Sequence, residues 1–147
     1  GLSNRWEIAN NRDPQDGLLY FEFDCGGWQT EGWRSTDISS NLAGSLGYLD
    51  FKLDNKKGTI YKERLQIREI NQQKSIAIKM KSTADLEIFV ANDHGDLGNA
   101  KYSANLSFQE VLIPLNKNTS LSGTTKLEIS FRGKKNDLVE IDYIKQK

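Results

Sequence analysis

The chain has 147 residues, of which 37% are hydrophobic and 27% are charged, and its 20 basic side chains balance its 20 acidic ones. This length and composition fit one soluble domain over 1–147, and the zero net charge excludes a general attraction to nucleic-acid backbones. No apolar run approaches the roughly 20 residues that a membrane-spanning helix needs. We therefore expect one folded domain that binds neither nucleic acid nor membrane.

Strand patterns begin early in the chain. The aromatic-rich run 18–24 is followed by a pair of glycines, which indicates a strand that ends in a turn. Apolar and polar residues alternate over 48–53, turn-forming residues occupy 54–58, and 59–61 resumes the pattern, so a hairpin is predicted here. The segment 62–73 mixes the spacings of helix and strand, and both interpretations stay open.

The second half of the chain repeats the alternation. Strands are expected at 76–81 and 86–90, followed by a loop at 91–99 that is rich in Asn, Asp and Gly. Another apolar run occupies 108–115, and the last two strands are predicted at 127–132 and 139–143. About eight to ten short strands with almost no helix predict an all-β fold, an antiparallel β-sandwich of the jelly-roll type.

Residues suited to catalysis are sparse. His94 is the one histidine of the chain, so a two-histidine metal motif cannot form. Carboxylates at positions i and i+2 share a strand face in two places, Glu22 with Asp24 and Glu140 with Asp142. Such pairs can serve acid–base chemistry or calcium binding, but most are simply solvated. A lyase or hydrolase is the least favoured interpretation, and we expect a protein that is not an enzyme.

Side chains that alternate with the expected core would form a polar sheet face that also carries aromatic rings. A ring can cover the C–H face of a pyranose, while charged side chains hydrogen-bond its hydroxyls or pair with sulfate and carboxylate groups. An ordinary solvated face explains the pattern equally well. The candidate sugar-binding residues of this face are Tyr48, Lys52, Lys79, Lys81, Phe89 and Arg132, and a competing site at the loop ends would use Trp28, Tyr61 and His94.

The segment 21–33, Phe-Glu-Phe-Asp-Cys-Gly-Gly-Trp-Gln-Thr-Glu-Gly-Trp, resembles the opening strand and Glu-Gly-Trp turn of carbohydrate-binding modules with a galactose-binding-like jelly-roll fold. Further matches follow in the same order, at 47–49, 75–81, 86–90 and 139–144, so the resemblance covers residues 18–147. It implies that Trp33 packs in the core and leaves Trp28 as the better candidate for exposure. It does not specify a sugar.

Modules of this kind are appended to polysaccharide-degrading enzymes. The resemblance therefore implies an extracellular or cell-surface module that holds a linked glycoside hydrolase or polysaccharide lyase against its polysaccharide. Basic residues on the expected face favour an anionic, sulfated or uronic, polysaccharide, although Glu87 and Glu128 weigh against it. Many relatives hold a structural calcium between the first and last strands, and the matching carboxylates here are Glu22, Asp24 and Asp142. The alternative is a structural β-sandwich that packs against a catalytic domain and binds no sugar.

Overall fold

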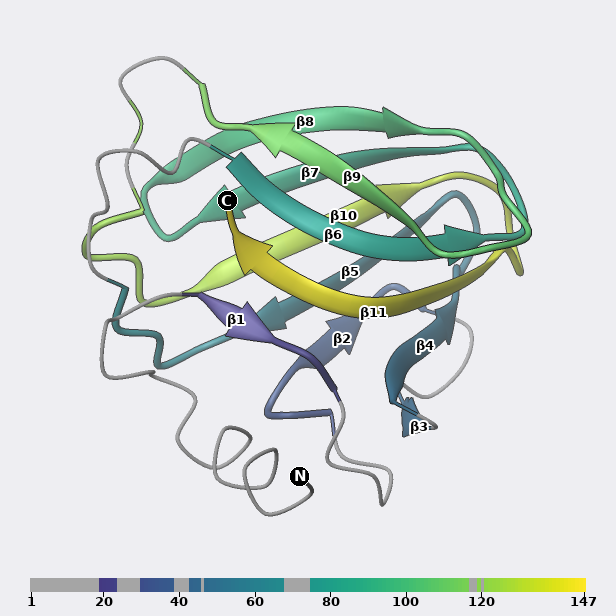
Figure 1. Cartoon of the computed structure of the whole chain (residues 1–147), viewed down its shortest axis with the longest axis horizontal. Helices are drawn as coiled ribbons and strands as arrows, with labels where there is room; N and C mark the ends of the chain where they lie inside the picture. Colours follow the sequence, from purple (N-terminus) through teal and green to yellow (C-terminus); the bar gives the residue numbers. More distant parts are fainter. Residues whose placement is uncertain are drawn as a thin grey trace.

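Eleven strands form two antiparallel sheets in the computed structural model, which describes residues 19–23, 30–38, 43–45, 47–67, 75–116, 119 and 121–147. Sheet A has the order β3-β4-β11-β6-β9, and β1 pairs with the end of β11; sheet B has the order β2-β5-β10-β7-β8 (Figure 1). The strands are β1 (Tyr20–Phe21), β2 (Arg34–Thr36), β3 (Ala43–Ser45), β4 (Tyr48–Lys52), β5 (Lys57–Lys62), β6 (Ser75–Ser82), β7 (Leu86–Asn92), β8 (Gly95–Tyr102), β9 (Gln109–Pro114), β10 (Leu127–Arg132) and β11 (Leu138–Gln146).

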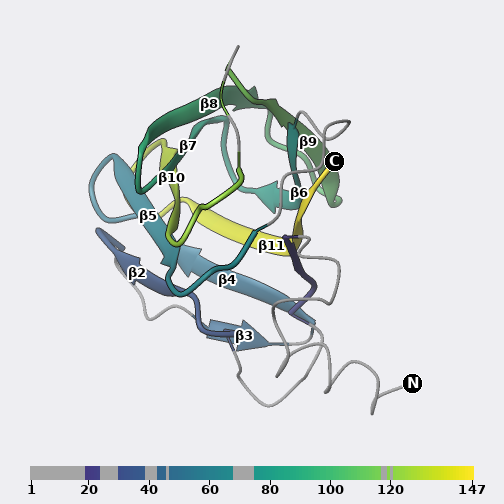
Figure 2. The same cartoon turned by 90° about the vertical axis from the view of Figure 1, so that its left-hand side faces the viewer.

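The chain winds between the two sheets in the manner of a jelly roll. Among the described strands, only β3 with β4 and β7 with β8 are consecutive partners in one sheet; every other consecutive pair lies in opposite sheets (Figure 2). The predicted β-sandwich is therefore confirmed. The predicted hairpin over 48–61 is wrong, because β4 joins sheet A and β5 joins sheet B, and the short turn between them carries the chain across the edge of the sandwich.

One further segment differs from the sequence-based expectation, and another answers part of a question that the sequence left open. The predicted loop 91–99 contains the end of β7 and the first half of β8, which pairs with β7 along its whole length. The described part of 62–73, which ends at Ile67, contains no helix, and 68–74 lies outside the described residues. Among the described residues, no helix is long and apolar enough to cross a membrane.

The core fills the space between the sheets with the apolar half of each alternating strand. Phe51 of sheet A and Phe131 of sheet B meet there with ring centroids 5.4 Å apart. Trp33 is 2% exposed, and its ring meets that of Phe21 edge-on at 5.5 Å. The expectation that Trp33 is a core residue is therefore confirmed.

A β-bulge in β11 changes which residues of the last strand face inward. Ile141 pairs with Met80 and Tyr143 with Lys79, so Asp142 is an extra residue on β11. Because of this shift, Tyr143 points outward and Ile144 takes the next core position. The sequence pattern, which placed Tyr143 in line with Val139 and Ile141, did not reveal the bulge.

Candidate functional site

The outer face of sheet B, called the sheet B face below, carries side chains in three rows that run across its strands. The strand registers place Arg34, Tyr61, Glu128 and Ala91 in the first row; Thr36, Thr59, Ser130, Phe89 and Asn99 in the second; and Lys57, Arg132, Glu87 and Lys101 in the third. Directly paired residues of antiparallel strands point to the same side of a sheet. Aromatic, hydroxyl and charged groups therefore lie together on one surface.

Small hydroxyl side chains occupy the middle of the sheet B face. The Oγ atoms of Thr59 and Ser130 are 3.0 Å apart, at hydrogen-bond distance, and Thr59 is only 7% exposed. Tyr61 lies in the next row on the strand of Thr59, and Phe89 lies beside Ser130 on β7, so two strand spacings and one row separate their positions by about 12 Å. The face thus presents two half-buried rings, each next to one member of the hydroxyl pair.

A cation accompanies each ring of the sheet B face. The Arg132 guanidinium carbon is 4.8 Å from the centroid of the Phe89 ring, and the Lys126 Nζ is 4.9 Å from that of Tyr61. Lys126 also forms an ion pair with Glu128, with 3.1 Å between Nζ and Oε1, and the hydrogen bond to Glu128 raises the pKa of Lys126. Exposed cation–ring contacts contribute about 0.5–1 kcal/mol each, so they position the rings without fixing them rigidly.

On the outer face of sheet A, more of the charged side chains pair with one another than on the sheet B face. Lys79 forms an ion pair with Asp142 at 3.8 Å, and Lys81 forms one with Glu140 at 3.9 Å. Tyr48 packs against Phe108, with 5.6 Å between ring centroids. Burial raises the pKa of Tyr48, and the nearby carboxylate of Glu140 raises it further.

A second cluster on the same face surrounds Tyr143. Its phenol donates a hydrogen bond to the Glu110 carboxylate, which also pairs with Lys147 at 2.7 Å. Hydrogen bonds from Lys147 and Tyr143 lower the pKa of Glu110, whereas burial and the bond to Glu110 raise the pKa of Tyr143 to about 12. Most of the polar groups of this face are therefore already engaged with one another.

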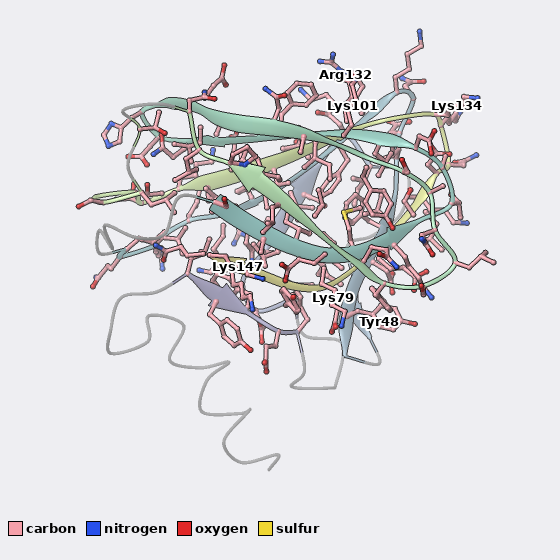
Figure 3. All side chains as sticks on the ribbon, turned by 45° about the horizontal axis from the view of Figure 1, so that its top comes forward. Tyr48, Lys79, Lys101, Arg132, Lys134 and Lys147 are labelled. Atoms are coloured by element: carbon pink, nitrogen blue, oxygen red, sulfur yellow. The ribbon has the colours of Figure 1, made fainter. Side chains whose placement is uncertain are left out.

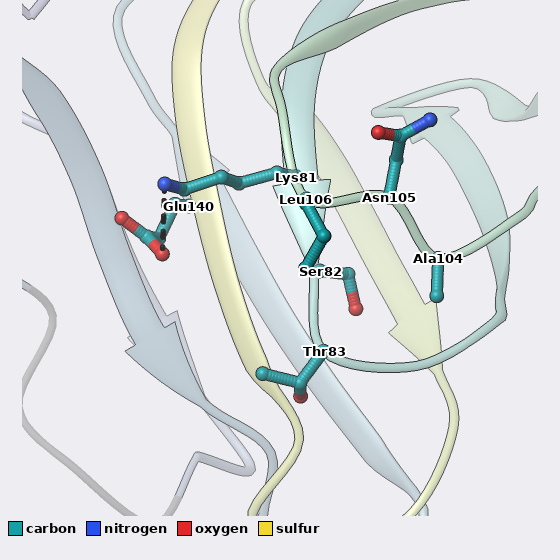
Figure 4. A pocket seen from close by; sticks show the side chains of 7 residues that line it. All are labelled: Lys81, Ser82, Thr83, Ala104, Asn105, Leu106 and Glu140. Atoms are coloured by element: carbon teal, nitrogen blue, oxygen red, sulfur yellow. Dashed lines mark ion pairs between the residues drawn. The ribbon is translucent and has the colours of Figure 1, made fainter.

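A hollow of about 590 Å³ lies beside this face, where the end of β6 meets the segment before β9. The Lys81–Glu140 ion pair borders the hollow on one side (Figure 4). Asn105 and the 99% exposed Leu106 border it from the segment before β9. The buried hydroxyl of Ser82, one of the lining residues, is already engaged, because it donates a hydrogen bond to the carbonyl of Ala84 at 2.8 Å, and we assign the hollow no ligand.

The structure divides the predicted sugar-binding residues between two opposite faces. Tyr48, Lys52, Lys79 and Lys81 belong to sheet A, and Tyr61, Phe89 and Arg132 belong to sheet B. The expectation of a single polar face is wrong, because alternation reveals which residues point outward but not which sheet a strand joins. Trp28 lies outside the described residues.

His94 lies in the turn between β7 and β8, and its side chain is 69% exposed. Its Nε2 is 3.4 Å from Asp93, whose pKa is lowered mainly by a hydrogen bond from the backbone of Thr125. Leu127 pairs with both Asn92 and Lys62, so this turn and Tyr61 lie at the same end of sheet B. Sequence reasoning missed the Thr59–Ser130 hydroxyl pair, which only the strand register reveals.

The carboxylates predicted to bind calcium are described only in part. Asp24 lies outside the described residues. Burial raises the pKa of Asp142, the charge of Lys79 lowers it, and that of Glu22 raises it, so Glu22 and Asp142 lie within electrostatic range of each other. Calcium takes six to eight oxygen ligands, and the described residues contain no group of three or more His, Cys, Asp or Glu arranged for a metal. Calcium at Glu22, Asp24 and Asp142 stays a prediction.

Comparison with known proteins gives a clear structural match. The sequence matches no protein-family model and no curated protein. A solved variant of CBM29-2, a family 29 carbohydrate-binding module, superposes with a TM-score of 0.61 at 12% identity, over 88% of this chain and 91% of that chain. The chain has the fold of family 29 modules.

Two other structures with the family 29 fold contain ligands. A variant of CBM29-2 complexed with cellulohexaose matches with a TM-score of 0.58 at 14% identity, over 88% of this chain and 91% of that chain. Another variant, complexed with mannohexaose, matches with a TM-score of 0.60 at 12% identity, over 88% of this chain and 92% of that chain. At these identities the similarity establishes the fold of the present chain, and the ligands belong to those proteins.

Proposed function

We propose that this chain is a non-catalytic carbohydrate-binding module that binds a linear polysaccharide across the sheet B face. One observation carries the proposal: two partly exposed rings, Tyr61 and Phe89, lie diagonally on one sheet face, each next to one member of the hydroxyl pair of Thr59 and Ser130. Rings at positions about 12 Å apart can contact separate sugar units of one chain. The shared fold with carbohydrate-binding modules supports this assignment.

The charged neighbours of the two rings suit hydrogen bonding to sugar hydroxyls. Glu87 and Lys101 of the third row are exposed and have no ion pair within the described part of the chain. The Arg132 guanidinium, which lies over Phe89, has five N–H donors in a planar arrangement. A pyranose that stacks on Phe89 would replace a weak cation–ring contact and gain hydrogen bonds from the displaced guanidinium.

The sheet B face is a better candidate than the outer face of sheet A, because fewer of its polar groups are already paired with one another. On sheet A, lysines 79, 81 and 147 are paired with carboxylates, and the phenol of Tyr143 is bonded to Glu110. A sugar would have to break these contacts in order to bind there. On the sheet B face the third row offers its charges without that cost.

The first ligands to consider are linear glucose and mannose oligomers, because structural neighbours contain cellulohexaose and mannohexaose. We further propose that the module acts outside the cell, in a longer chain with a glycoside hydrolase or polysaccharide lyase. Weak binding at one site would then be strengthened by linkage to the enzyme. The basic residues of the sequence favour an anionic polysaccharide, which would require lysines free of ion pairs beside the sheet B face.

A structural role against a neighbouring domain is the competing proposal. Leu112 is 48% exposed on the outer face of sheet A, and Leu106 is almost fully exposed in the chain segment before β9. Exposed apolar side chains of this kind suit a protein interface. This role predicts no affinity for any polysaccharide.

Affinity electrophoresis with Phe89→Ala and Phe108→Ala tests the proposal with a matched pair. Both phenylalanines are half-buried and lie under a cation, at 4.8 Å for Phe89 on sheet B and 4.9 Å for Phe108 beside sheet A. We expect a retained polysaccharide to bind Phe89→Ala at least about tenfold more weakly and Phe108→Ala unchanged. The opposite result would transfer the site to sheet A, and no retention by any polysaccharide would favour the structural role.

A further inference from the structure

Four lysines surround a hollow of about 660 Å³ at one end of the sandwich. Lys56 lies in the turn that joins β4 to β5, Lys57 is the first residue of β5, and Lys134 and Lys135 lie in the turn that joins β10 to β11. We call this site the lysine hollow. Residues 56, 134 and 135 belong to no strand, so only the three-dimensional arrangement of the turns brings the four cations together.

Hydrogen bonds fasten the two turns of the lysine hollow to each other. Leu53 donates its backbone N–H to the carbonyl of Asp137 at 3.0 Å, and Asn136 donates to Leu53 at 3.0 Å. Gly133 donates to the carbonyl of Lys56 at 2.9 Å, and a Cβ atom on Gly133 would lie 2.6 Å from the side chain of Leu86. The turns are therefore closely packed, and their backbones bring the four exposed lysine side chains together around the hollow.

The lysine hollow has an excess of positive charge. Two carboxylates, Asp37 and Asp54, line it, and a third, that of Asp137, borders it by accepting a hydrogen bond from the backbone N–H of Lys134 at 2.7 Å; four ammonium groups beside three carboxylates leave one net positive charge. None of its four lysines forms an ion pair within the described part of the chain, whereas those at 79, 81, 126 and 147 all do. In a chain with no net charge, this is a local concentration of unneutralised cations.

The lysine hollow adjoins the sheet B face. Lys57 pairs with Arg132 in the third row, Arg132 lies over Phe89, and the row ends at Lys101. Arg132, Lys101 and Lys134 are labelled in Figure 3, where their side chains extend from the same side of the molecule. A polymer that stacks on Phe89 could therefore reach both sites.

We propose that the lysine hollow binds anionic substituents, sulfate esters or uronate carboxylates, of a polysaccharide whose chain lies on the sheet B face. The inference rests on the proposed function, because it assumes that a glycan occupies that face. Ammonium groups gathered around an open hollow attract anions through charge, and each contact is partly screened by salt. A neutral glycan can accept hydrogen bonds from these ammonium groups but lacks the charge attraction that an anionic glycan gains.

The test compares two charge-matched triple variants. Lys56→Gln, Lys134→Gln and Lys135→Gln remove three charges from the lysine hollow; Lys79→Gln, Lys81→Gln and Lys145→Gln remove three from the outer face of sheet A. The probes are carrageenan with its desulfated form and polygalacturonate with its methyl ester, measured by affinity electrophoresis at low and high salt. Each pair differs in anionic charge with the sugar chain kept the same.

We expect at least one anionic polymer to bind more tightly than its neutral form, with an advantage that shrinks at high salt. The hollow variant should bind that polymer about tenfold more weakly, and the sheet A variant should match the wild type. The polymer that responds identifies sulfate or carboxylate as the substituent. Equal binding by both triple variants, or no preference for either charged polymer, would overturn the inference.

Phe89→Ala separates failure of this inference from failure of the proposed function. If a neutral polymer binds, Phe89→Ala abolishes its binding, and the anionic polymers bind the hollow variant as tightly as the wild type, the lysine hollow is not an anion site and the sheet B face remains a binding site. If anionic polymers bind through the lysines and Phe89→Ala has no effect, the hollow is an anion site and the proposed sheet B face is wrong.

Discussion

Gly98 lies where the two sheets meet, at a position with almost no space for a side chain. A Cβ atom at this position of β8 would lie 2.3 Å from the carbonyl oxygen of Pro114 on β9, in the opposite sheet. Non-bonded heavy atoms are most stable near 3.5 Å, so Gly98→Ala must separate the strands by about 1 Å. The neighbouring hydrogen bond from the Asn116 N–H to the Leu97 carbonyl, 2.6 Å long, resists that separation.

Overpacking of this kind costs about 1–3 kcal/mol of the free energy of unfolding. At this chain length, that corresponds to a fall in Tm of about 3–10 °C, measured by circular dichroism. Asn99→Ala is the control, because Asn99 is the next residue of β8 and is exposed on the outer face. A Tm of Gly98→Ala equal to that of Asn99→Ala would refute the close approach of β8 and β9.

Three further predictions concern the core, the alkaline pH range and calcium. Phe131→Ala removes the ring contact with Phe51 in the core. It should lower the free energy of unfolding by about 3–5 kcal/mol in chemical denaturation, and a loss below about 1 kcal/mol would contradict a buried contact between the two sheets. The pKa of Tyr143 is raised to about 12, so the folded state favours the neutral phenol and loses that stability as the pH rises from about 10 through 12. Tyr143→Phe should therefore show a shallower fall of Tm over this range, and identical profiles would contradict it. Calcium should raise the Tm of the wild type but not of Asp142→Asn, and no effect on either protein would argue against the predicted ion.

The strands were predictable wherever one face is buried and the other is solvated. Alternation over 48–52 and 127–131 identifies core and outer residues correctly, because burial selects every second side chain. The same alternation cannot assign a strand to a sheet. That assignment depends on pairings far apart in sequence, such as β1 with β11, and it separated Tyr48 from Tyr61 and Lys81 from Arg132.

Strand β8 and the bulge at Asp142 show the other limit of sequence reasoning. The first half of β8 contains Gly, Asp and Asn, residues typical of turns, yet it pairs with β7 at the edge of sheet B. The bulge adds one residue to β11 with no local signal, and it reverses the faces of Tyr143 and Ile144. Pairing with the preceding strand overrides local preference in β8, and pairing with the distant β6 does so at the bulge; pairing between distant strands also determines which candidate residues meet on one face.

The most direct test of carbohydrate binding on the sheet B face is chemical-shift mapping by NMR during titration with cellohexaose and then mannohexaose. We predict that the largest amide shifts lie in β5, β10 and β7, around Tyr61, Ser130 and Phe89. Shifts centred on the outer face of sheet A, around Tyr48, Lys79 and Lys81, would contradict the account.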